Sequence, residues 1–156
     1  MRIFVPFILA LGACAPQYEE RIATSELDVP VRLALFESQP DPLDDAFRAA
    51  CDSPGDTIRM MSRGIVQCRI LPSPDLAAFL LLEFDGALEA PILVMQKRTT
   101  QADGRYLVEM SYFAEITQKS GAARRVYFQQ RRLDSLVDRM LEAAGGVPTD
   151  RRELDA

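Results

Sequence analysis

The chain has 156 residues, of which 48% are hydrophobic and 26% charged, the size and balance of one globular domain rather than a disordered or fibrous protein. It has no histidine, which excludes Ser-His-Asp and Cys-His catalytic pairs, a histidine proton shuttle and histidine-containing zinc sites. The formal net charge of −5 argues against nucleic acid as a partner.

Residues 1–14 read MRIFVPFILALGAC, with one positive charge at Arg2, an apolar run and two small residues before a cysteine. This layout is typical of a secretory signal. The apolar run has about nine residues, whereas a membrane-spanning helix needs about 20. We therefore expect the segment to be cleaved rather than retained as an anchor.

The residues Leu11-Gly12-Ala13-Cys14 resemble the lipobox of bacterial lipoproteins, in which a leucine and two small residues precede a cysteine. The resemblance implies a diacylglycerol group on the Cys14 sulfur, cleavage after residues 1–13, and a further acyl group, commonly palmitate, on the new amino terminus. Two or three acyl chains hold a protein stably at a membrane. Because Ala15 follows in place of aspartate, the resemblance favours the outer membrane, with the domain facing the periplasm. The alternative is an ordinary secretory signal followed by an incidental cysteine.

Residues 14–30 contain prolines and a charged stretch with little periodicity, which predicts a solvated, lipidated tether. The folded domain is expected over residues 31–146. A first short strand is predicted at 31–36. Asp41 as a cap and Pro42 as the first helical residue predict a helix that runs to about Cys51, with Leu43, Ala46, Phe47, Ala50 and Cys51 on one apolar face.

The two remaining cysteines are both expected to point inward. Residues 53–56 predict a turn, and residues 64–71 a strand with Cys68 on its apolar side. In an oxidising compartment this arrangement predicts a Cys51–Cys68 disulfide. Two buried free thiols are the alternative.

The segment after this strand is ambiguous. Ser73 followed by Pro74 indicates a helix start, but the apolar run that follows would also suit a buried strand, so residues 75–84 are compatible with either.

The second half of the domain is predicted as β-structure followed by one helix. Strands are expected at 92–100 and 105–117 around a turn at 102–104, and at 124–129. In the second strand one face is apolar and carries Tyr106, Val108, Met110, Tyr112, Ala114 and Ile116. The helix presents Leu133, Leu136, Val137, Met140, Leu141 and Ala144 inward and ends at Gly145-Gly146 and Pro148.

Residues 147–156 are expected to be a flexible tail. Together these elements predict an α+β domain: an antiparallel sheet of four or five strands, covered on one face by two or three helices.

Charged residues are distributed unevenly along the chain. Residues 19–56 carry ten acidic and three basic side chains, whereas 97–132 carry eight basic and three acidic, which favours a docking surface. Four arginines, Arg124, Arg125, Arg131 and Arg132, form a candidate site for an anion or an acidic partner.

The first hypothesis is therefore a non-enzymatic accessory or assembly protein of the cell envelope that binds another protein and needs no cofactor or metal. The second is a carrier of lipid or another apolar ligand, with a pocket lined by Tyr106, Met110 and Tyr112, although core packing also explains these residues. The third is a peptidoglycan-directed enzyme or binding module, and a glycosidase of this kind would need two carboxylates at a set distance.

Overall fold

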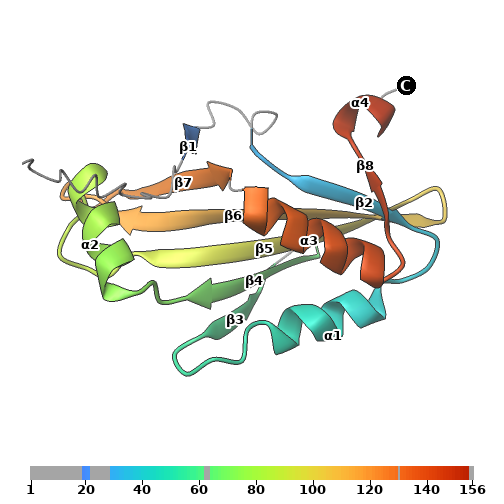
Figure 1. Cartoon of the computed structure of the whole chain (residues 1–156), viewed down its shortest axis with the longest axis horizontal. Coiled ribbons are helices and arrows are strands. Elements are labelled where there is room, and N and C mark those ends of the chain that lie inside the picture. The colour runs from blue at the N-terminus through green and yellow to red at the C-terminus, as the bar shows by residue number, and fades with distance from the viewer. Residues whose placement is uncertain (1–18, 22–28, 62–63, 130, 155–156) are drawn as a thin grey trace, which may run out of the picture.

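The computed structural model describes residues 19–21, 29–61, 64–129 and 131–154. They form one antiparallel sheet of eight strands and four helices (Figure 1). The strands are β1 Glu19–Arg21, β2 Arg32–Phe36, β3 Thr57–Met60, β4 Ile65–Ile70, β5 Ile92–Ala102, β6 Arg105–Thr117, β7 Ala123–Gln129 and β8 Val147–Thr149. The helices are α1 Asp41–Ala49, α2 Pro74–Glu83, α3 Arg131–Ala143 and α4 Arg151–Leu154.

The long hairpin of β5 and β6 is the centre of the sheet. Its two turn residues, Asp103 and Gly104, both have positive φ angles, of 53° and 79°, as a tight two-residue hairpin turn requires. The turn determines the register, in which Ala102 pairs with Arg105 and every later pair follows up to Ile92 with Glu115. β4 and then β3 add to the free edge of β5.

The other edge of β6 pairs with two different strands. β2 pairs with residues 106–110 and β7 with residues 113–117. Ser111 and Tyr112 lie between these two stretches and belong to neither ladder. The sheet therefore has a break in this row of strands, at the middle of β6.

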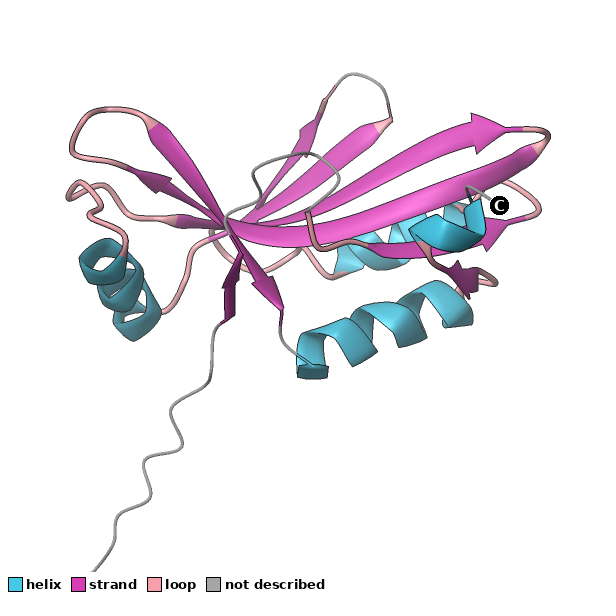
Figure 2. Cartoon of the chain, turned by 90° about the horizontal axis from the view of Figure 1, so that it is seen from above, coloured by secondary structure: helices cyan, strands magenta, loops and turns pink. Residues whose placement is uncertain are grey.

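Helices α1, α2 and α3 all cover the same face of the sheet (Figures 1 and 2). One core cluster joins α1 and α3 to β2, β4 and the first half of β6, around Phe47, Met110 and Leu141. A second joins α2 to β7 and the end of β6, around Leu80 and Ile116. The core is thus divided between the two ends of one face.

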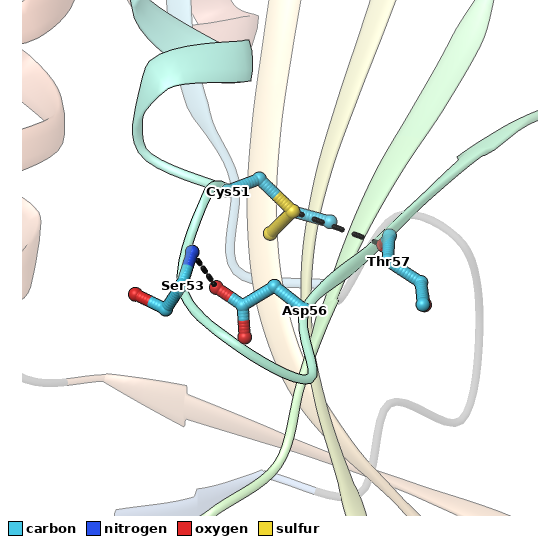
Figure 3. The surroundings of a disulfide bond; sticks show 5 residues. Cys51, Ser53, Asp56 and Thr57 are labelled. Atoms are coloured by element: carbon cyan, nitrogen blue, oxygen red, sulfur yellow. Dashed lines mark hydrogen bonds between the residues drawn. A yellow bond between two sulfur atoms is a disulfide. The ribbon is translucent and has the colours of Figure 1, made fainter.

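The predicted disulfide between Cys51 and Cys68 is confirmed. It joins the end of α1 to β4, and the loop from Ser53 to Thr57 folds beside it (Figure 3). The two sulfur atoms lie within 4.8 Å of an Asp56 carboxylate oxygen. Because they are bonded to each other, they lack the thiolate charge that a metal ligand needs.

The sheet has more strands than the predicted four or five. The five predicted strands correspond to β2, β4, β5, β6 and β7, and the three additional ones are short. β1 lies in the predicted tether, where it pairs with β7. β8 lies in the predicted tail and pairs with β2, so the ordered fold continues past residue 146. Pro148 does not simply stop α3, since it lies inside β8 on the outer edge of the sheet.

Two local expectations about the helices need correction, and one question that the sequence left open is answered. Pro40, not Asp41, occupies the position before α1, and no side chain caps that helix. The ambiguous segment at 75–84 is helical, as α2. On α3, Val137 and Leu141 are buried as expected, but Leu136 is 55% exposed.

Candidate functional site: a polar hollow on the open face of the sheet

The sheet face opposite α1, α2 and α3, called the open face below, carries the polar side chains of the central strands. In β6, Glu109 and Ser111 alternate with the core residues and therefore point to the open face. Ser111 pairs with Gln96 of β5, and Glu109 with Arg98, so the four side chains lie on one face. They line a hollow of about 290 Å³ together with Arg125, Tyr127 and Arg151.

Two glutamates of β6 organise the charges of the open face. Glu109 lies 3.5 Å from a guanidinium nitrogen of Arg98 and 4.0 Å from one of Arg151. Glu115 lies 2.6 Å from a nitrogen of Arg69 and 3.3 Å from one of Arg125.

Four guanidinium groups thus share two carboxylates. Counted over the described residues alone, this network has two more positive charges than negative ones, and each glutamate contacts a pair of arginines. The two carboxylates neutralise arginines rather than face each other across a cleft.

Aromatic rings support the arginines at one end of the hollow. The Arg125 guanidinium lies 5.0 Å from the centre of the Phe113 ring, and that ring is 5.1 Å from the ring of Tyr127. Phe113 is buried although α1, α2 and α3 all lie on the other side of the sheet. The stack removes Phe113 from water and orients the Arg125 side chain at the same time.

The structure does not bring the four predicted arginines together. Arg124 and Arg125 are neighbours in β7, so their side chains leave opposite faces of the sheet. Arg124 lies over the ring of Phe84 at the end of α2, 5.1 Å from its centre. Arg131 and Arg132 are exposed in the first turn of α3.

Of the predicted cluster only Arg125 belongs to the open face. Arg69, Arg98 and Arg151 were missed because they come from three segments far apart in the sequence. One of these contacts could have been predicted from the sequence. The Asp-Gly turn sets the register of the hairpin, and that register pairs Arg98 with Glu109.

The other predicted site residues fall in different places. Tyr106 and Met110 pack in the core cluster beneath α1 and α3, as the packing explanation expects. Tyr112 borders an apolar hollow between α2 and α3, and its hydroxyl donates to Asp134. Cys14 lies outside the described residues.

An ion pair between a buried lysine and a partly exposed aspartate links α1 to the sheet. Lys97 of β5 points to the helix-covered side, where its ammonium group pairs with the carboxylate of Asp44. Burial lowers the pKa of Lys97 below its ordinary value of 10.5. A second link, from Arg32 to Asp138 at 2.5 and 2.7 Å, holds α3, and it raises the pKa of Arg32.

Comparisons with protein-family models, curated proteins and solved structures found no match to this chain. Among the helices in the described ranges, none has both the length and the apolar composition needed to cross a bilayer.

Proposed function

We propose that the protein is a lipid-anchored lipoprotein of the bacterial outer membrane whose periplasmic domain binds an acidic segment of another protein through the open face of its sheet. The proposed role is that of an accessory or assembly subunit of the cell envelope, without catalysis. The lipobox resemblance at Cys14 supports the location. The charge network around the hollow supports the binding.

The observation that carries the binding role is the excess of arginines over glutamates. Arginine binds carboxylates through two parallel hydrogen bonds, and an arginine already held by one carboxylate is positioned to receive another. Gln96, Ser111 and Tyr127 add neutral hydrogen-bonding groups to the same hollow. A ligand with carboxylates and backbone amides matches this combination.

The spacing of the arginine pairs favours an extended ligand. The pairs are centred on Glu109 and Glu115, six residues apart on one strand. At about 3.3 Å per residue they are separated by roughly 20 Å. A small anion reaches one pair only, whereas an extended peptide with acidic residues about six positions apart reaches both.

Binding is tested with the chain from residue 14 onward, carrying Cys14→Ser to keep it free of lipid, and a fluorescent peptide with two glutamates six residues apart. We expect salt-sensitive binding that the double variant Arg98→Gln/Arg125→Gln weakens by at least tenfold, since one hydrogen bond to a charged group contributes about 1.5–3 kcal/mol. Arg48→Gln is the matched control, because Arg48 is exposed on α1, on the other side of the sheet. Equal losses in both variants, or no binding at low salt, would reject the role.

The anchor is tested separately by mass spectrometry of the protein from its native membranes. The expected mass is that of residues 14–156 plus two or three acyl chains, and Cys14→Ala should abolish the lipid. Residues 1–13 still attached, or a bare Cys14, would contradict the proposed location and leave the binding test unaffected.

A further inference from the structure

The middle of the helix-covered face contains an apolar hollow. Along β6, the core positions on either side of the middle are buried, with Val108 and Ala114 both at 0% exposure. Tyr112 between them is only partly buried, as are its neighbours Leu93 and Met95 on β5. These residues line a hollow together with Leu76 of α2 and Leu133 of α3. Figure 1 shows the two helices apart from each other on this face of the sheet.

The hollow has a volume of about 210 Å³. Leu76 of α2 and Leu133 of α3 form its sides, and the strands form its floor. An engineered cavity of about 150 Å³ with similar walls stays dry and binds benzene, so a hollow of this size accepts a hydrocarbon group of at least that size.

The walls exclude polar ligands. The hydroxyl of Tyr112 is the side-chain polar group among the lining residues, and it already donates to the carboxylate of Asp134. A sugar or peptide amide placed here would lose its hydrogen bonds to water without replacement, whereas an alkyl chain would lose only unfavourable contact with water.

Two basic residues adjoin the lining residue Leu133 in the sequence. Arg131 and Arg132 are exposed and directly precede Leu133, in the first turn of α3. In Figure 1 this end of α3 is the one that faces α2. A molecule with a hydrocarbon chain and an anionic head complements both features, the chain in the hollow and the head beside the arginines.

We propose that the hollow between α2 and α3 binds the alkyl chain of a fatty acid or anionic lipid, with its head group beside Arg131 and Arg132. This site is on the opposite side of the sheet from the acidic-peptide site and does not depend on it. Chain length is the first determinant of affinity, because each added methylene that enters the hollow tightens binding by about fourfold.

The test uses the Cys14→Ser chain from residue 14 onward, with methyl NMR spectra recorded during titration with octanoate, decanoate and decanol. We expect the methyl signals of Leu76, Leu93, Met95 and Leu133 to shift, with decanoate binding more tightly than octanoate. Vesicles of diacyl phosphatidylglycerol form a second arm. Shifts with decanoate alone identify a free fatty acid as the source of the chain, and shifts of the same signals with vesicles identify a membrane lipid.

One pair of tryptophan variants and one double arginine variant make the test specific. Leu133→Trp fills the hollow and should weaken decanoate binding at least tenfold, whereas Leu136→Trp, one turn away on the exposed side of α3, should leave it unchanged. Arg131→Gln/Arg132→Gln should weaken decanoate about fivefold and leave decanol unchanged, since two exposed charges contribute modestly.

The double variant Arg131→Gln/Arg132→Gln changes only exposed side chains, so it is informative even if Leu133→Trp fails to fold. Equal effects of the two tryptophan variants, or no methyl shifts with either decanoate or vesicles, would overturn the proposal.

Discussion

Reduction of the Cys51–Cys68 disulfide should remove a large share of the stability of the domain. The bond closes a loop with a sequence separation of 17 residues. The chain-entropy relation gives about 3 kcal/mol for a loop of this length at 25 °C, against a total of roughly 5–15 kcal/mol for a typical domain. Both sulfur atoms are buried, so the reduced thiols keep their packing and the loss of the crosslink is the main change.

Urea unfolding of oxidised and reduced protein, followed by far-UV circular dichroism, measures this difference. The variant Cys51→Ala/Cys68→Ala should be less stable than the reduced protein, because it also removes the two buried sulfur atoms. Reductant added to that variant is the control and should have no effect. Identical unfolding midpoints for oxidised and reduced wild-type protein would refute the reasoning.

Three further substitutions test the contacts that hold the helices to the sheet. Burial lowers the pKa of Lys97 in the folded protein below 10.5, its value in the unfolded chain. Between these two pKa values the unfolded chain binds more protons than the folded one, so the free energy of unfolding should rise with pH in that range. Lys97→Met should remove this rise, as urea titrations at about pH 8 and about pH 10 can measure. Arg32→Gln breaks the pair that Arg32 forms with Asp138 through two hydrogen bonds. Because both side chains are partly exposed, the substitution should lower the free energy of unfolding by about 1 kcal/mol in the same titration. Gly146→Ala places a Cβ atom 2.5 Å from the ring of the buried Phe36 and should cost about 1–3 kcal/mol, visible as a lower thermal midpoint.

The elements that the sequence predicted well are those with strong local patterns. The strands of the central hairpin alternate over many residues around an Asp-Gly turn, and α1 and α3 have apolar positions at helical spacing. The missed strands β1, β3 and β8 have three or four residues each. Strands this short carry no measurable alternation, and only their pairing with a longer strand stabilises them.

The candidate site was predicted poorly because its arginines meet only through the sheet. Sequence proximity suggested Arg124 with Arg125, but adjacent strand residues point to opposite faces. Arg69 reaches Glu115 from β4, although β5 lies between β4 and β6. Arg151 comes from the predicted tail, which is ordered by β8. Such contacts depend on strand order, which local propensity does not specify.

Both proposed sites are centred on the break in the pairing of β6. Along this edge of β6 the ladder with β2 stops at Met110 and the ladder with β7 starts at Phe113, so Ser111 and Tyr112 lie between the two ladders. Because the two residues are adjacent, Ser111 faces the polar hollow and Tyr112 the apolar one. The interruption between the two ladders therefore lies between the polar hollow on one side of the sheet and the apolar hollow on the other.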